Sequence, residues 1–169
     1  MINESNVVTL QELRVELIGH FTFCLEIPYY FSGNQMYKAQ RTKSGKTWVR
    51  KEIKVWELQK LICSKITELN IKAPKNAFCY CSHIAFFFSK YDWITKNSSN
   101  LKEIDLTNLL KPVEDAIFGL GIRDLDFLGL EIDDSKGVYN VQSKCVLPED
   151  FKTPPFYVAV DLTFYEKLG

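Results

Sequence analysis

Hydrophobic and polar residues alternate along several stretches of the chain, and this period of two is typical of β-strands. In residues 13–27 the apolar positions Phe23, Leu25 and Ile27 alternate with polar or small ones. Pro28 follows directly, and because proline cannot donate a hydrogen bond to a strand ladder, the strand is predicted to end there. Further strands are predicted at residues 76–91, 127–132, 138–147 and 156–165.

Two other stretches repeat their apolar residues at intervals of three and four, which predicts amphipathic helices over residues 48–69 and 105–118. Residues 28–47 have no regular period and are predicted to form a loop of about 20 residues, a length that usually marks a functional or mobile segment. The order of elements is strand, loop, long helix, strand, helix and two or three strands. It predicts the α+β class, a mixed β-sheet with two helices packed on one face.

Length and composition place the chain among single-domain globular proteins. Its 169 residues suit one domain over 1–169, with residues 1–12 expected to form a flexible N-terminal extension. Hydrophobic residues make up 46% of the chain, enough to exclude general disorder. No apolar run reaches the roughly 18 residues of a membrane helix, and the start lacks the pattern of a signal peptide. We therefore expect a cytoplasmic protein with no membrane partner and reduced cysteines.

The formal net charge is zero, but the charges are unevenly distributed along the chain. Residues 1–101 hold 14 Lys and Arg against 8 Asp and Glu, whereas residues 102–169 hold 7 against 13. The densest basic stretch runs from Lys38 to Lys54 and contains one acid, Glu52. A basic segment combined with a carboxylate cluster suits a polyanionic substrate and a catalytic cation. The alternative is that the basic stretch is a solvated loop and helix start.

The polar residues of the 105–118 helix form a stripe that can carry chemistry. Asp105, Asn108, Lys111 and Asp115 fall at steps of three and four, so they share one helix face. Asp124 and Asp126 follow after two glycines, and a tight turn can return Asp126 to the neighbourhood of Asp105. Converging aspartates suit magnesium or manganese, and an adjacent lysine suits a phosphate oxygen, which together favour phosphodiester hydrolysis. The alternative is a solvated acidic helix face.

These residues resemble the motif of the RusA-type Holliday junction resolvases, which are small endodeoxyribonucleases. The pattern is Asp105-Leu106-Thr107-Asn108, Lys111, Asp115-Ala116, Gly121 and Asp126. The N-terminal half is similar to the family as well, with a strand, Pro28, the segment Ser32-Gly33-Asn34 and a basic stretch that enters a long helix. The resemblance covers roughly residues 20–166.

The resemblance implies a RusA-like fold, a homodimer, and paired nicks in a four-way DNA junction during recombination and repair. By position it implies Asp105 and Asp126 as magnesium ligands, with Asp124 as a further candidate, and Lys111 as the catalytic lysine. Manganese is an alternative metal. The expected DNA contacts are Asn34, Lys38, Arg41, Lys43, Lys46, Arg50 and Asn108.

The chain departs from the family at Thr107, where the motif usually carries a second aspartate. Asp124, Glu103 or Asp115 are alternative sources of that negative charge. Two other functions therefore stay open, a non-catalytic branched-DNA-binding protein and a small protein-interaction domain. Separately, Cys79, Cys81 and His83 alternate along one predicted strand, and with Cys63 they could bind zinc. Their spacing is not that of a zinc finger, so core packing is favoured.

Overall fold

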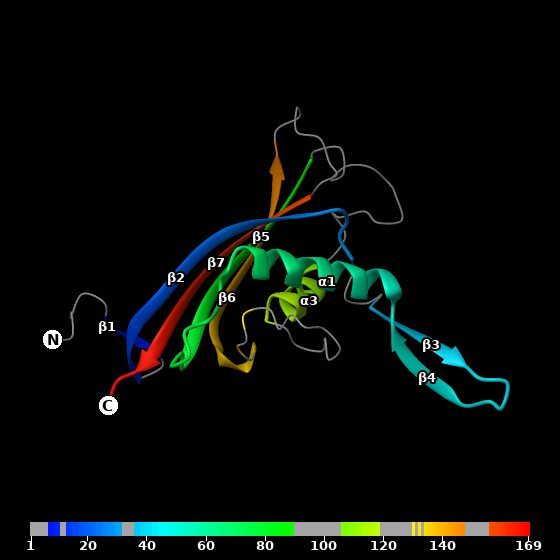
Figure 1. Cartoon of the computed structure of the whole chain (residues 1–169), viewed down its shortest axis with the longest axis horizontal. Helices are drawn as coiled ribbons and strands as arrows, with labels where there is room; N and C mark the ends of the chain where they lie inside the picture. Colours follow the sequence, from blue (N-terminus) through cyan, green and yellow to red (C-terminus); the bar gives the residue numbers. More distant parts are fainter. Residues whose placement is uncertain are drawn as a thin grey trace.

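A computed structural model describes residues 7–10, 13–31, 36–89, 106–118, 130, 132, 134–147 and 156–169. The strands are β1 (Val7–Leu10), β2 (Leu13–Ile27), β3 (Tyr37–Arg41), β4 (Thr47–Lys51), β5 (Cys79–Ser89), β6 (Gly137–Leu147) and β7 (Phe156–Lys167). The helices are α1 (Ile53–Glu68), α3 (Leu106–Ile117) and the short 3-10 turn η3 (Asp134–Lys136). Figure 1 shows their arrangement.

The main sheet of the described chain has five strands in the order β1-β2-β7-β5-β6. The β5 and β6 strands run parallel, and the other neighbouring pairs are antiparallel, so the predicted mixed sheet is confirmed. The long β2 strand was predicted with the same bounds, 13–27. Residues 7–10, within the expected N-terminal extension, form β1 and pair with β2.

The core lies between one face of the sheet and the two helices α1 and α3 (Figure 1). Alternate residues of each central strand point into it, among them Leu25 of β2, Phe86 of β5 and Leu162 of β7, all with at most 1% of their surface exposed. The apolar stripe of α1, which includes Leu58 and Ile62, packs against them. This arrangement confirms the predicted α+β class for the described residues. Within those residues, neither helix is long and apolar enough to cross a membrane.

The segment before α1 differs from its prediction. Residues 37–41 and 47–51 do not belong to a loop and a helix start but pair as an antiparallel two-stranded sheet, β3 and β4. Nearly every residue of this hairpin is exposed, and a ribbon with no buried face needs no apolar alternation, so the period-two signal was absent. The α1 helix begins only at Ile53, after Glu52 in an extended conformation.

Figure 1 shows the β3–β4 hairpin extending beyond the N-terminal end of α1, away from the main sheet. The chain crosses from β4 to α1 through Glu52 alone, whose backbone N–H donates to the carbonyl of Met36 just before β3. Met36 is buried, with 1% of its surface exposed. This contact joins the base of the hairpin to the body of the protein and so fixes the point from which it projects.

Candidate functional site

The α3 helix carries the described part of the motif. It was predicted over residues 105–118 and is observed at Leu106–Ile117, with Pro112 in its interior. Proline lacks the N–H that would bond to the carbonyl one turn earlier, which normally costs about 3 kcal/mol. The carbonyl of Pro112 also accepts a hydrogen bond from outside the helix, because the buried Gln59 side chain donates to it at 3.0 Å. This bond joins α3 to α1, and within the polar stripe Lys111 is exposed whereas Asp115 is buried.

Lys111 and Asp115 form an ion pair one turn apart on α3, with 2.7 Å between Nζ and Oδ1. The Lys111 side chain is 53% exposed, whereas that of Asp115 is only 10% exposed. A lysine ammonium group carries three donors, and Asp115 occupies one of them. Lys111 thus presents an ammonium group at the surface whose position is set by a buried carboxylate.

Lys51, the last residue of β4, reaches the same place from the hairpin. Its Nζ donates to Oε1 of Gln59 at 2.8 Å, and Gln59 in turn bonds to Pro112. Partial burial lowers the pKa of Lys51, the Asp115 carboxylate raises it, and the Lys111 ammonium lowers it. The side chains of Lys111 and Asp115 are thus close enough to Lys51 to influence its pKa. Lys51, Gln59, Lys111 and Asp115 are called the lysine cluster below.

The lysine cluster is suited to binding an anion. It holds the ammonium groups of Lys51 and Lys111, and partial burial strengthens electrostatic interactions relative to bulk water. The Lys111 side chain is exposed, so a phosphate oxygen can reach its ammonium group. The cluster also ties three elements together, because its members come from β4, α1 and α3.

The sequence-predicted site residues divide into three groups. Lys111 and Asn108 lie on α3, where Lys111 is exposed and Asn108 is partly buried. The expected DNA contacts Lys38, Arg41, Lys43, Lys46 and Arg50 lie on the β3–β4 hairpin or its turn, all exposed. Asp105, Asp124, Asp126 and Asn34 lie outside the described residues. In the described chain, hydrogen bonds from Lys51 to Gln59 and from Gln59 to Pro112 therefore join the base of the hairpin to the helix that carries Lys111.

Sequence reasoning missed Lys51 and Gln59 as members of the cluster. A signal for Gln59 existed, because it stands next to Leu58 and three residues before Ile62, on the apolar stripe of the helix. A polar side chain at a core position needs a hydrogen-bond partner. Its partner could not be named, because it lies 53 residues away on α3.

The alternating Cys81 and His83 do not share a site with Cys63. The thiol of Cys63 is buried on the helix side of the sheet and donates to the carbonyl of Ala116 at 3.1 Å. His83 is exposed and its Nε2 lies 2.8 Å from Oγ of Ser143 on β6. Across the described residues, no three His, Cys, Asp or Glu side chains are grouped to hold a metal ion.

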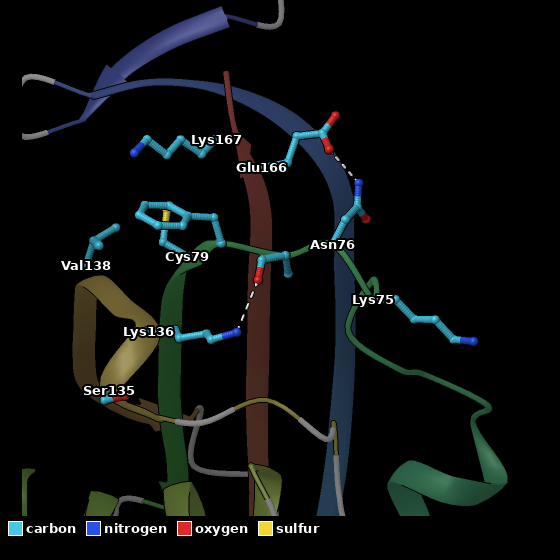
Figure 2. Close-up of a pocket in the computed structure, with 10 residues that line it drawn as sticks. Lys75, Asn76, Cys79, Ser135, Lys136, Val138, Glu166 and Lys167 are labelled. Atoms are coloured by element: carbon cyan, nitrogen blue, oxygen red, sulfur yellow. Dashed lines mark hydrogen bonds between the residues drawn. The ribbon is translucent and has the colours of Figure 1, made fainter. Parts of the chain in front are cut away.

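A surface pocket of about 630 Å³ lies at the end of the sheet where β5 and β6 begin (Figure 2). Its lining includes three lysines, but these do not converge. Lys75 points away from the pocket, Lys136 donates to the carbonyl of Ala77 at 3.3 Å, and Lys167 lies over the ring of Phe78. The one carboxylate of its lining, Glu166, accepts a hydrogen bond from Asn76. Among the described residues that line this pocket, Glu166 has no second carboxylate beside it of the kind that phosphodiester hydrolysis requires.

Neither a protein-family model nor a curated protein matches the chain.

Proposed function

We propose that the protein is a magnesium-dependent endodeoxyribonuclease with a RusA-like fold that resolves Holliday junctions. It acts as a cytoplasmic homodimer, and its two sites make paired nicks in a four-way DNA junction in recombination or repair. The proposal rests first on the spacing from Asp105 to Asp126, which matches the motif of the resolvase family without a gap.

The structural observation that carries the proposal is the meeting of α3 with the basic hairpin. Lys111 on the motif helix pairs with Asp115, and Lys51 at the hairpin base donates to Gln59, which donates to the carbonyl of Pro112. A DNA backbone held along the hairpin would thus lead to the ammonium group of Lys111. A nuclease needs this continuity between the surface that grips DNA and the group that contacts the scissile phosphate.

The donor chemistry of the motif suits the proposed metal. The proposed ligands Asp105 and Asp126, and the further candidate Asp124, carry carboxylates, the hard oxygen ligands that magnesium and manganese prefer. Asp115 is already paired with Lys111, so we assign it to positioning that lysine and not to the metal. When bound, the metal would polarise the scissile phosphate and acidify a water molecule.

The remaining work falls to side chains of this chain. Lys111 contacts a non-bridging oxygen of the scissile phosphate and stabilises the charge that develops there. Asp115 holds that ammonium group in place. Asn108, which lies one turn earlier on the same helix face, has a positioning role. The exposed cations of the hairpin bind the phosphates of the arms, which supply most of the sequence-independent affinity.

The test is cleavage of a synthetic four-way junction with magnesium and with EDTA, by the natural chain, two site variants and two control variants. We expect Asp126→Asn to lose at least about 100-fold in rate and Lys111→Met to lose about 100- to 1,000-fold, as for removal of a charge-stabilising donor. Asp161→Asn and Lys75→Met make the same chemical changes away from the motif and should cut normally. Equal cutting by the Asp126→Asn variant, or cutting in EDTA, would refute the nuclease assignment.

One observation favours a second candidate function, a non-catalytic protein that binds branched DNA. Thr107 stands in the first turn of α3, exposed, where the family usually carries an aspartate. A neutral hydroxyl is a weaker magnesium ligand than a carboxylate. This candidate predicts junction binding without cleavage by the natural chain, and cleavage that appears in the Thr107→Asp variant.

A further inference from the structure

The β3–β4 hairpin concentrates positive charge more than any other segment of comparable length. Residues 37–51 contain six Lys and Arg and no acid. One of these cations, Lys38, pairs with Glu52 just beyond the hairpin at 2.9 Å. Arg41, Lys43, Lys46 and Arg50 are all exposed. The hairpin therefore presents a dense field that attracts a polyanion.

The hairpin turn is braced by its own hydrogen bonds. The backbone N–H of Thr42 donates to the carbonyl of Lys46 at 2.8 Å, and the Thr42 hydroxyl accepts from the Lys46 N–H at 3.1 Å. The same hydroxyl lies 2.9 Å from that of Ser44. Gly45 has φ of +83°, the left-handed conformation that closes a three-residue hairpin loop. A pre-ordered tip loses little conformational freedom when it binds.

The strand register distributes the cations over both faces of the ribbon. Lys38 lies opposite Arg50, and Gln40 lies opposite Trp48, so these four side chains share one face. The guanidinium of Arg50 stands 6.0 Å from the centre of the Trp48 ring. The opposite face carries Arg41 opposite Thr47 and Lys51 opposite Tyr37. A ribbon with cations on both faces can contact two phosphate backbones at once.

Apolar side chains are also exposed between these cations. Tyr37, Trp48 and Val49 have 54%, 46% and 64% of their surface exposed. In the described sheets β3 and β4 pair only with each other, and an isolated two-stranded hairpin is marginally stable in water. The combination of exposed aromatic, aliphatic and amide groups with flanking cations matches a DNA groove, whose walls are phosphates and whose floor is base edges.

The dimensions agree with that partner. Two paired strands are about 4.8 Å apart, and five residues of strand span about 17 Å. The major groove of B-form DNA is about 12 Å wide and admits a two-stranded ribbon, whereas that of A-form RNA is too narrow for side chains to read. We infer that the β3–β4 hairpin enters the major groove of double-helical DNA, with Arg41, Lys43, Lys46 and Arg50 on the phosphates. The choice of DNA rests on the proposed function.

The first test measures equilibrium binding of a DNA duplex by the full chain in EDTA, so that it does not depend on cleavage. Each phosphate contact adds about 0.9 to the dependence of log K on log salt. The variant R41Q/K43Q/K46Q/R50Q should reduce that slope by about 3.6 and weaken binding at least about 100-fold at about 0.1 M salt. The smaller variant K43Q/K46Q should reduce the slope by about 1.8.

The matched control removes the same charge from exposed lysines of the body, in the variant K72Q/K75Q/K136Q/K167Q. This control variant should reduce the slope of log K against log salt by less than about 0.9, the contribution of one phosphate contact. An equal loss of slope in the control and the hairpin variant would overturn the inference, because binding would then follow net charge. Circular dichroism of all variants confirms that the sheet and helices are retained.

The second test locates the groove by dimethyl sulfate footprinting, which modifies guanine N7 in the major groove and adenine N3 in the minor groove. We expect protection of guanine N7 that disappears in the hairpin variant. Protection confined to adenine N3, or binding of heparin or duplex RNA as tightly as DNA, would overturn the inference. Hairpin-dependent duplex binding without junction cleavage would refute the nuclease proposal alone, so the two failures are distinguishable.

Discussion

Replacement of Gln59 by leucine tests the link between the hairpin and the motif helix. The Gln59 side chain has no exposed surface and makes two hydrogen bonds, one from Lys51 and one to the carbonyl of Pro112. Leucine has nearly the same volume but can make neither bond. The substitution therefore removes the polar bridge between β4 and α3 without opening a large cavity.

The expected cost follows from the groups left behind. The carbonyl of Pro112 keeps the helix N–H four residues further on and loses only its second donor, which costs about 0.5–1.5 kcal/mol for one hydrogen bond. Lys51 loses a neutral acceptor but can turn toward water, which adds about 1 kcal/mol at most. Leucine recovers about 1 kcal/mol by burying apolar surface. The free energy of unfolding should fall by about 1 kcal/mol, which for a chain of this size lowers Tm by roughly 2–4 °C.

The assay is urea unfolding followed by circular dichroism, with Gln142→Leu on β6 as the matched control. Gln142 undergoes the same chemical change at a partly buried position with no side-chain hydrogen bond described for it, so its variant should stay within about 0.5 kcal/mol of the natural chain. If the Gln59→Leu variant also unfolds within that range, the bridge contributes no stability and the reasoning fails.

Three further outcomes are expected. In an NMR titration, the pKa of Lys51 should lie below its ordinary value because of burial, and Asp115→Asn should lower it further because the carboxylate raises it; an unchanged pKa in that variant would separate the two groups. Burial opposes ionisation of Asp161, but hydrogen bonds from His20 and a neighbouring threonine lower its pKa overall. The ionised carboxylate of Asp161 therefore contributes to stability above about pH 4, and this contribution is lost as pH falls through the lower folded pKa. In urea unfolding, the free-energy advantage of the natural chain over Asp161→Asn should shrink from about pH 4 toward pH 2. A constant advantage would contradict this. Gly45→Ala should destabilise the hairpin tip by about 1 kcal/mol and speed its amide exchange, whereas Gly45→Asn should not, because asparagine tolerates positive φ and the position has open space.

The elements with one buried face were predictable from their periodicity. The β2 strand was expected at its observed bounds, and β7 and α3 differ by at most two residues at either end. Each of these elements packs against the core, so burial imposes a period of two or about 3.6 on its residues. The helix predicted over 48–69 was correct only from residue 53, because Trp48 and Val49 continued its apolar pattern by chance while lying on the exposed hairpin.

The candidate site was predictable in its residue types but not in its arrangement. Lys111 and Asp115 are one turn apart, so their pairing follows from helix geometry alone. Lys51 and Gln59 are only eight positions apart, but they join α3 because β4, α1 and α3 meet in space. No local pattern encodes the contact of Gln59 with Pro112, which lies 53 positions further along the chain.

Local chemistry along the chain was thus sufficient for the fold class, for the central strands and helices, and for the polar stripe of α3, because each depends on neighbours within one or two turns. Only the folded structure revealed the order of the strands in the sheet, the direction in which the hairpin projects and the contacts of the lysine cluster. Those features are set by which buried surfaces pack together and by where a buried polar group finds its partner, and both are properties of the whole chain.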